Sequence, residues 1–292
     1  MTRTFDAFSL AVDGGGTRCR IALVGGEMPL VAGAGSVNVS TDFAGATAEL
    51  LRGFQDLAMQ AGGTLDDLSP VPAYIGLAGV TGPELAERLA EGLPLVHVRI
   101  EDDRLAALRG ALGRSDGVVA HCGTGSFVAS RRAGQVRLAG GWGPVLGDEA
   151  SAQWVGRQAL ARTLDAVDGF LVETELSRGL LSKFGSAAEI VAFAGAASPA
   201  DLGALAVMVT DNAAAGDGIA VAILQNAAED VVTACKRLGW TSGMPICLTG
   251  GIGPFYRPYL PADMQQDVMP PKGEPLAGAI ALAEEFRKEI HS

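Results

Sequence analysis

One pattern, a short apolar segment, a glycine-rich turn and a second apolar segment, occurs twice in this chain of 292 residues. The first copy surrounds residues 13–17, and the second surrounds residues 123–126, about 110 positions later. Two apolar runs joined by such a turn are typical of a β-hairpin. Because each copy stands near the start of a half-chain of similar size, the repeat predicts a duplicated domain.

Alternating helical and extended patterns follow each hairpin, which indicates an α/β protein with mixed sheets. In the first half we expect helix 42–61, strand 73–77, a helix capped by Thr81, strand 95–100 and a helix from 102 or 103 to 112. In the second half we expect helices 148–165, 199–213, 216–238 and 275–290, and strand 245–248. The expected domains are 1–114 and 115–292, with helix 275–290 able to pack back on the first.

The chain is acidic, with 22 Lys and Arg against 33 Asp and Glu and a net charge of −11. Such a surface repels nucleic-acid phosphates and anionic membranes, so neither is an expected partner. The longest run without charges, 238–256, holds five glycines and two prolines, which a membrane-spanning helix would not favour. No signal peptide is recognisable at the N-terminus, and we expect a cytoplasmic protein.

Several common kinds of site are not expected in this chain. Its four cysteines and three histidines are scattered, which favours neither a disulfide framework nor a zinc site. There are four lysines and none follows a glycine, so a phosphate loop of the Gly-Lys type is excluded. No G-x-G-x-x-G opens a helix after a strand, which excludes the usual dinucleotide-binding turn.

The first turn consists of Asp13, Gly14, Gly15, Gly16 and Thr17. Glycines let backbone N–H groups approach an anion, Thr adds a hydroxyl donor, and an Asp at a strand end can hold a hydrated divalent cation. An ordinary tight turn is the alternative, but three consecutive glycines exceed what a two-residue turn needs. We therefore interpret this turn as part of a site for a nucleoside triphosphate with Mg²⁺, which Asp13 would hold through water.

Two further turns have a similar composition. They are Gly123, Thr124, Gly125 and Ser126 between two strands, and Thr249, Gly250 and Gly251 after another strand. The former is rich in backbone and hydroxyl donors for phosphate, and the latter would let a flat base lie against the backbone. Each could be a structural turn when it is taken singly.

In this order, the three turns resemble the two phosphate motifs and the adenosine motif of the ATPase superfamily that includes actin and the sugar kinases. Within it, residues 12–18, VDGGGTR, are similar to the BadF/BadG/BcrA/BcrD ATPase family, which includes N-acetylglucosamine and glucosamine kinases. Residues 275–279, PLAGA, are also similar to that family. The resemblance implies two ribonuclease H-like domains with ATP in the cleft between them.

Three acidic residues, 101–103, stand between an expected strand and an expected helix. A carboxylate there could take the proton of a sugar hydroxyl during phosphoryl transfer, or could merely cap the helix. In the sugar kinases that this chain resembles, an Asn-Asp or Asp pair heads the corresponding helix, and alanines follow three to four positions later. Asp103, followed by Ala106 and Ala107, matches that pattern as the base, with Asp102 as the alternative.

Residues 140–149, GGWGPVLGDE, form the most specific segment of the chain. A flat indole suits a sugar face, and paired carboxylates suit sugar hydroxyls. The residues predicted to bind sugar here are Gly141, Trp142, Asp148 and Glu149. The alternative places Trp142 in the core and Asp148 at a helix cap. The segment resembles that of amino-sugar kinases, although Ala150 stands where Gly is common, and Asn38 would fit the family's substrate-side Asn.

The resemblance implies an ATP-dependent kinase acting on the 6-hydroxyl of N-acetylglucosamine or glucosamine. The sequence leaves the oligomeric state open, and a homodimer is possible. A BadF-type ATPase that activates a reductase is the alternative, and it would need thiolates for an iron-sulfur cluster. Cys122 directly precedes Gly123, whereas activators have the Cys three residues before the Gly. A sugar-sensing regulator would usually add a DNA-binding segment, for which we expect no room before the first strand.

Overall fold

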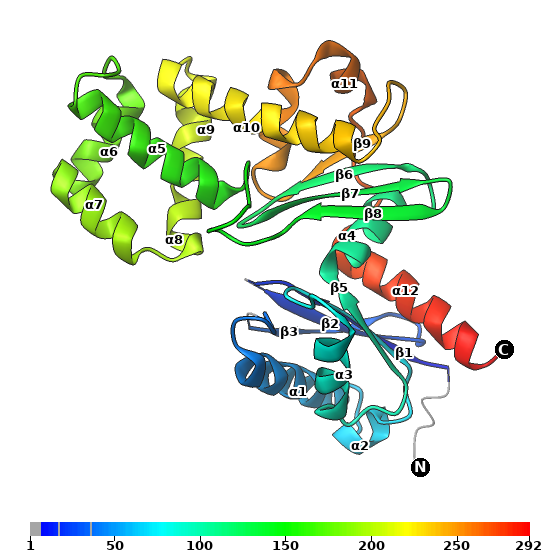
Figure 1. Ribbon diagram of the computed structural model, residues 1–292. Helices are drawn as coiled ribbons and strands as arrows, with labels where there is room; N and C mark the ends of the chain where they lie inside the picture. Colours follow the sequence, from blue (N-terminus) through cyan, green and yellow to red (C-terminus); the bar gives the residue numbers. More distant parts are fainter. Residues whose placement is uncertain (1–6, 17, 36) are drawn as a thin grey trace. The chain divides into compact units, whose positions relative to one another are not determined.

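The computed structural model describes residues 7–16, 18–35 and 37–292, and the chain forms two compact units (Figure 1). The first unit comprises Met1–Ser115 and Pro271–Ser292, and the second comprises Asp116–Pro270. Each unit contains one sheet in which antiparallel and parallel pairs occur together. The prediction of an α/β fold with mixed sheets is therefore confirmed.

In the first unit the sheet has five strands in the order β3-β2-β1-β4-β5. They are β1 (Ser9–Gly14), β2 (Cys19–Val24), β3 (Leu30–Ala34), β4 (Ala73–Leu77) and β5 (Val98–Asp102). β2 is antiparallel to both β1 and β3, whereas β4 is parallel to both β1 and β5. The carboxyl ends of β1, β4 and β5 consequently meet at one edge of the sheet.

Helices cover both faces of this sheet (Figure 1). They are α1 (Phe43–Gln60), α2 (Leu65–Leu68), α3 (Pro83–Glu91), α4 (Asp103–Leu112) and α12 (Pro275–Ile290). Alternate strand residues such as Val12 and Ile75 pack in one core with Leu50 of α1 and Leu89 of α3. On the other face, small side chains of the strands, α4 and α12 pack together, and these include Ala11, Ala22, Ala106, Ala279 and Ala283.

α12 packs against α4 at very short range. A Cβ added to Gly278 would lie 1.9 Å from the carbonyl oxygen of Ala106, and one added to Gly110 would lie 2.3 Å from that of Glu274. Only glycine permits this approach at the two positions, which gives a packing reason for the PLAGA segment. Because of these contacts the last helix belongs to the first unit, and the second unit ends at Pro270.

The sheet of the second unit has the order β8-β7-β6-β9. Its strands are β6 (Gly117–Cys122), β7 (Ser126–Arg132), β8 (Gln135–Gly140) and β9 (Ile246–Thr249). β7 is antiparallel to both β6 and β8, and β9 is parallel to β6. Both units thus share one strand arrangement. Three consecutive antiparallel strands form a meander, and a later strand pairs in parallel with the first of them.

The helices of the second unit pack around one large core. They are α5 (Ala152–Val167), α6 (Glu175–Phe184), α7 (Ala187–Ala196), α8 (Pro199–Ala204), α9 (Ala206–Ala214), α10 (Gly218–Arg237), the 3-10 helix η1 (Gly253–Tyr259) and α11 (Ala262–Asp267). Among the described residues, α10 alone is long and apolar enough to span a membrane. Its buried residues, among them Ile223, Leu224 and Ala227, belong to this core, and core helices pass the same test.

Several predicted boundaries were wrong, and the predicted helix 199–213 is divided into α8 and α9. Gly82 rather than Thr81 precedes α3, because Pro83 takes the first helical position, which proline favours. β5 starts at Val98 instead of residue 95 and extends through Asp102. α5 starts at Ala152 instead of residue 148, because the Ser151 side chain accepts a hydrogen bond from the Trp154 N–H and caps the helix.

Candidate functional site

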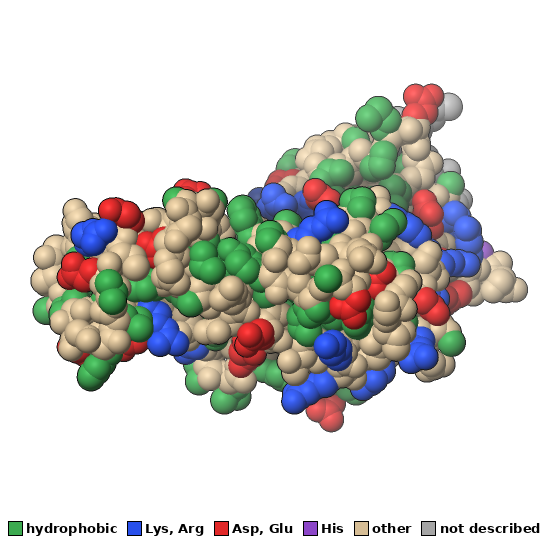
Figure 2. Space-filling model, turned by 90° about the horizontal axis from the view of Figure 1, so that it is seen from above, with side chains coloured by type: hydrophobic (Ala, Val, Ile, Leu, Met, Phe, Trp, Pro, Cys, Tyr) green, Lys and Arg blue, Asp and Glu red, His purple; other side chains and the backbone are tan. Residues whose placement is uncertain are grey.

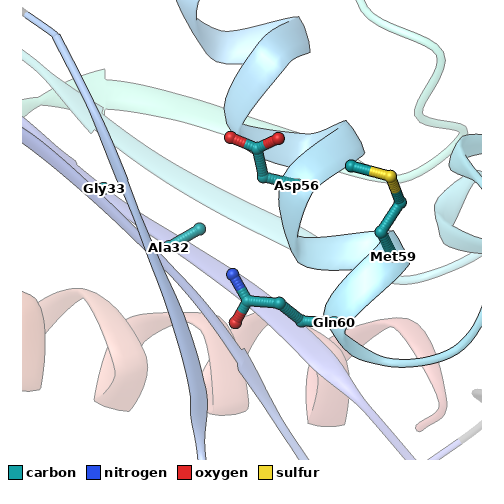
Figure 3. Close-up of a pocket in the computed structure, with 5 residues that line it drawn as sticks. All are labelled: Ala32, Gly33, Asp56, Met59 and Gln60. Carbon is teal, nitrogen blue, oxygen red and sulfur yellow. The ribbon is translucent and has the colours of Figure 1, made fainter.

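On the face drawn in Figure 2, Lys and Arg side chains lie among Asp, Glu and apolar side chains, without a large area of one charge. A hollow of about 420 Å³ opens between β3 and α1 in the first unit (Figure 3). Its lining residues are Ala32, Gly33, Asp56, Met59 and Gln60. None of these is a predicted site residue, so the site has to be built from the predicted residues themselves.

Asp13 lies near the end of β1, in register with Arg20 of β2 and Gly76 of β4. Its partly buried carboxylate accepts a hydrogen bond from Arg20, with 2.8 Å between Nη2 and Oδ2. Arg20 also forms an ion pair with Glu274. Burial raises the pKa of Asp13, and the hydrogen bond from Arg20 opposes that rise. Oδ1 of Asp13 receives no hydrogen bond from the described residues and could face a hydrated cation.

Asp103 is the first residue of α4 and lies over β4. Its Cα would be 3.5 Å from a Cβ added to Gly76, the strand neighbour of Asp13. Burial, and then the nearby carboxylate of Asp102, raise the pKa of Asp103 to about 7, and Asp13 adds to this rise. A carboxyl group with such a pKa is well suited to accept a proton near neutral pH.

Asp102 has a different environment. Its side chain caps α4 by accepting a hydrogen bond from the backbone N–H of Arg104, at 2.9 Å. The guanidinium of Arg104 donates to both carboxylate oxygens, at 2.7 Å to Oδ1 and 2.5 Å to Oδ2. Both oxygens of Asp102 are therefore engaged, which favours Asp103 in the choice of base that the sequence leaves open.

Asn38 lies at the same edge of the sheet. The N–H of Val37 donates to the carbonyl of Gly15 at 3.1 Å, and the N–H of Val39 donates to that of Ala78 at 3.3 Å. Asn38 and Ala78 form an isolated parallel bridge. The structure thus brings Asn38 close to the first glycine turn, while its side-chain oxygen accepts hydrogen bonds from the N–H and hydroxyl of Ser40.

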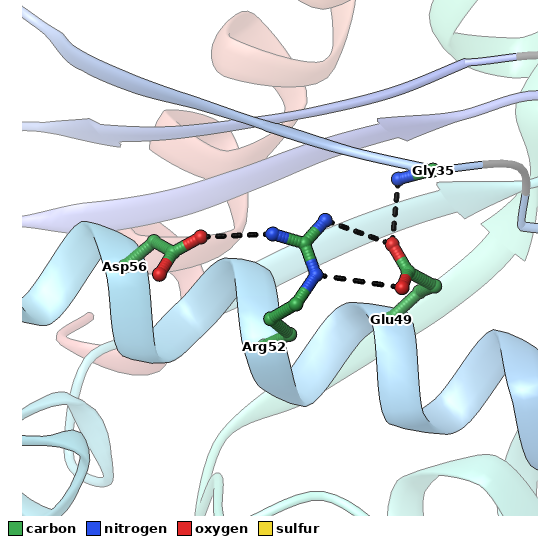
Figure 4. A network of polar contacts seen from close by, with 4 residues as sticks. All are labelled: Gly35, Glu49, Arg52 and Asp56. Atoms are coloured by element: carbon green, nitrogen blue, oxygen red, sulfur yellow. Dashed lines mark hydrogen bonds and ion pairs between the residues drawn. The ribbon is translucent and has the colours of Figure 1, made fainter.

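The segment before Asn38 is attached to α1 (Figure 4). The N–H of Gly35 donates to Oε2 of Glu49 at 2.7 Å. Arg52 pairs with Glu49 on one side and with Asp56 on the other. All three side chains are at least one-third exposed, so each ion pair contributes little stability, but together they fix the direction in which the chain leaves β3.

The glycines of the first turn have different surroundings. The N–H of Gly15 donates to the carbonyl of Arg18 at 2.9 Å and closes the turn. A Cβ on Gly14 would lie 2.3 Å from Cδ2 of Leu77, whereas one on Gly16 would find its nearest neighbour 4.0 Å away. A side chain at position 14 would therefore have to displace the buried Leu77 side chain, whereas a methyl group has space at position 16. Thr17 lies outside the described residues.

The second turn rests on the segment 148–152. The N–H of Gly123 donates to the carbonyl of Gly125 at 2.9 Å, which closes the turn. Oδ1 of Asp148 accepts a hydrogen bond from the N–H of Ser126 at 3.3 Å, and the hydroxyl of Ser126 donates to the carbonyl of Glu149 at 2.5 Å. Asp148 is buried, and burial raises its pKa. The hydrogen bond from the backbone N–H of Ser126 opposes this rise.

The third turn packs directly on the second. Gly250 has a φ of +79°, and a Cβ there would lie 2.3 Å from the carbonyl oxygen of Cys122. That carbonyl also accepts a hydrogen bond from the N–H of Ile252 at 3.1 Å. Gly251 has no atom within 4 Å of the position that a Cβ would occupy. The structure therefore brings together the two turns that the sequence assigned to phosphate and base.

His121 was not predicted as a site residue. It precedes the second turn, its Nδ1 lies 3.1 Å from Oγ1 of Thr249, and its ring stacks on that of Phe127 with 4.9 Å between centroids. Burial lowers the pKa of His121 to about 4, so the ring is neutral at pH 7. Its position one residue before the end of β6, like that of Asp13 in β1, was a signal in the sequence.

Trp142 lies on the loop after β8 and is 67% exposed, so the alternative of a core tryptophan is wrong. Gly140, Gly141 and Gly143 on either side of it all have positive φ, which bulkier residues avoid. Glu149 is likewise exposed, unlike Asp148. Trp142 and Glu149 are therefore open to a ligand, whereas Asp148 lies beneath the second turn.

Comparisons with known proteins place this arrangement among kinases and ATPases. A glucosamine kinase of Vibrio cholerae is 26% identical over 280 residues, which cover 94% of this chain and 95% of that protein. An N-acetyl-D-glucosamine kinase of Dictyostelium discoideum is 32% identical over 169 residues, or 53% of each protein.

A Chromobacterium violaceum structure described as a candidate N-acetylglucosamine kinase has a TM-score of 0.82 and 32% identity, and the match covers 95% of this chain and 99% of that one. A Streptomyces griseus glucokinase solved with glucose and AMPPNP has a TM-score of 0.57 at 17% identity over 95% and 99% of the two chains, which supports the fold alone. The fold is that of the actin-like ATPases and sugar kinases. Since residues 10–257 also match the family's sequence model, the chain belongs to the BadF/BadG/BcrA/BcrD ATPase family.

Proposed function

We propose that this protein is an ATP-dependent amino-sugar kinase that phosphorylates the 6-hydroxyl of N-acetylglucosamine or glucosamine. The observation that carries the proposal is Asp103, whose carboxyl has a pKa of about 7 and whose Cα lies beside Gly76, the β-strand neighbour of Asp13. The kinase names of the relatives support the substrate class. A small sugar is accordingly the expected partner.

Asp103 acts as the general base in this proposal. As the 6-hydroxyl oxygen attacks the γ-phosphorus of ATP, its proton moves to the Asp103 carboxylate, the bond from the γ-phosphorus to the bridging oxygen breaks, and ADP leaves. The products are the sugar 6-phosphate, ADP and a proton that Asp103 later releases to water.

ATP is bound mainly by backbone groups in this proposal. The glycine-rich turns 13–17, 123–126 and 249–251 would let the backbone approach phosphate and base closely, as such turns commonly do. The free Oδ1 of Asp13 fits Mg²⁺ held through water, because Mg²⁺ bound to a nucleotide commonly needs only one or two protein carboxylates. When bound, Mg²⁺ would neutralise charge on the phosphates.

The sugar contacts are assigned to Asn38, Gly141, Trp142, Asp148 and Glu149. The exposed indole of Trp142 is available to cover a sugar face. Asp148 already accepts hydrogen bonds from Ser126 and Gln153, but a carboxylate has about four lone-pair positions and can accept another from a sugar hydroxyl.

A coupled assay of ADP release with Mg-ATP tests the proposal over amino sugars, hexoses and acidic sugars, with the phosphorylated position identified by NMR. We expect release that depends on N-acetylglucosamine or glucosamine and a 6-phosphate product. ADP release independent of every sugar, together with iron in protein purified without oxygen, would contradict the proposal and favour the reductase activator. All four cysteines are buried, which is unfavourable for an iron-sulfur cluster shared at a dimer face.

A further inference from the structure

Tyr256 joins two segments of the second unit that are far apart in the sequence. It lies in η1, shortly after the third turn, and its side chain is fully buried. Its hydroxyl donates a hydrogen bond of 2.6 Å to the carbonyl oxygen of Ala150. Ala150 belongs to the segment 148–152 that supports the second turn. This side-chain hydrogen bond therefore connects the helix that follows the third turn to the segment 148–152.

The backbone at this connection is strained. Asp148 and Ala150 both have a φ of +62°, in the left-handed region. Such a conformation costs an L-residue with a Cβ about 1–2 kcal/mol, whereas glycine adopts it readily. Strained backbone persists only where surrounding contacts hold it. For Ala150 the hydrogen bond from Tyr256 is such a contact, because it fixes the orientation of the peptide group that follows Ala150.

The strained segment in turn positions the second turn. Asp148 accepts the N–H of Ser126, and the Glu149 carbonyl accepts the hydroxyl of Ser126. The next residues are tied in as well, because the N–H of Ala152 donates to the carbonyl of Gly123 at 2.8 Å. A relaxation of Ala150 toward negative φ would shift the groups on both sides of it and release these bonds.

We propose that Tyr256 is a positioning residue for phosphoryl transfer. Its hydroxyl holds Ala150 in the left-handed conformation, and thereby keeps Asp148 and Glu149 against the turn that binds phosphate. This role rests on the proposed function, since the second turn and the segment 148–149 are there assigned to ATP and sugar. Because position 150 is an alanine with a positive φ rather than a glycine, the hydroxyl of Tyr256 matters more there than it would beside a glycine.

Tyr256→Phe removes this hydroxyl and keeps the buried ring. We expect kcat/KM for the amino sugar to fall about tenfold and the affinity for an ATP analogue to fall about fivefold, the size that the loss of one good hydrogen bond produces. Tyr259→Phe is the matched control, because Tyr259 lies in the same short helix and its hydroxyl bonds to none of the described residues. We expect less than about a twofold change in that variant.

A second substitution separates positioning from general stability. In an Ala150→Gly background the left-handed backbone needs less support, so Tyr256→Phe should reduce kcat/KM only about twofold. Ala133→Gly provides the matched control background, because Ala133 has a φ of +49° but lies in the turn between β7 and β8. There the tenfold loss should remain. An equal loss in the Ala150→Gly and Ala133→Gly backgrounds would overturn the role of Tyr256.

Thermal unfolding and binding of the ATP analogue are measured on every variant. If wild-type protein phosphorylates no amino sugar, the proposed function fails, while the analogue affinities still test the connection from Tyr256 to the second turn. Unchanged analogue affinity and unchanged kcat/KM in folded Tyr256→Phe would overturn the connection. Should Tyr256→Phe fold poorly, the double variant with Ala150→Gly must recover both folding and affinity, and failure of that recovery also overturns it.

Discussion

The hairpins β1–β2 and β6–β7 have the same strand arrangement and different chemistry. Asp13 stands one residue before the end of β1, and His121 stands one residue before the end of β6. Each is in register with an antiparallel strand on one side and a parallel strand on the other. Asp13 keeps a charged partner, Arg20, whereas burial lowers the pKa of His121 to about 4 and leaves it neutral.

In the proposed function, this difference gives the two units separate tasks. The first turn is surrounded by ionisable groups, namely Asp13, Arg20 and Asp103, which can exchange a proton or attract a cation. The second turn is supported by backbone hydrogen bonds and by the buried Asp148 beneath it. Substitutions of charge should therefore act most strongly in the first unit, and substitutions of backbone shape in the second.

Asp103→Asn should have the largest effect. Loss of the base should reduce kcat about 10³-fold, while affinity for an ATP analogue stays within about twofold of wild type, since the amide keeps the size of the carboxyl. Stopped assays of ADP release and calorimetry measure the two quantities. Asp102→Asn is the comparison variant: asparagine caps a helix about as well as aspartate and Asp103 is kept, so turnover should persist, while loss of the neighbouring charge should lower the pKa of Asp103. Wild-type turnover in Asp103→Asn would remove Asp103 from the mechanism.

The pH dependence of kcat/KM follows from the same residue. Asp103 has a pKa of about 7 and must be ionised to accept a proton, so activity should rise with pH through about 7 and then level off. Below this value kcat/KM should fall about tenfold for each pH unit. His121 contributes no change in this range, because its pKa of about 4 leaves it neutral throughout. A flat profile between about pH 5 and 8 would contradict the assignment.

Local patterns were sufficient to predict much of the fold. β4 and the start of α4 occur where the sequence placed them, because a short apolar run and an Asp cap are signals within a few residues. β3 and β8 were not predicted. Both are edge strands with many exposed or half-exposed residues, so neither has the apolar alternation of a strand with one buried face.

The sequence predicted the three glycine-rich turns of the site, but it did not predict the contacts that support those turns. Arg20 binds Asp13 because of strand register, and Tyr256 binds Ala150 across 106 positions, so no local pattern contains either contact. The left-handed backbone at Ala150 had one signal, which was an alanine in place of the more common glycine. Positions of this kind become informative only when the tertiary contacts are known.

Arg20→Met tests the charge on the first turn. Methionine keeps the apolar stem but leaves the partly buried carboxylate of Asp13 without its cation, and we expect a loss of about 2 kcal/mol in the free energy of unfolding at pH 8. Urea unfolding measures this loss, and the exposed Arg18→Met is the control, expected within about 0.5 kcal/mol of wild type. His121→Phe should cost less than Arg20→Met because it removes no charge. The reverse order would break the comparison between the turns.

The glycines provide the finest test, because each unit has one glycine where an added methyl group would be crowded and one where it has space. Gly16→Ala and Gly251→Ala place a methyl group where no described atom lies closer than 4.0 Å, so stability should be unchanged and ATP affinity should fall about tenfold. Gly14→Ala and Gly250→Ala are the matched variants, in which the methyl group would approach a neighbouring atom to 2.3 Å. That atom is the movable Cδ2 of Leu77 at position 14 but backbone of Cys122 at position 250, so Gly250→Ala should destabilise the fold more. Equal losses of affinity at the two open glycines would mean that backbone from both units contacts the nucleotide. A loss at one alone would assign phosphate binding to that unit, and folded variants with wild-type affinity at both would exclude a close approach of ATP to either turn.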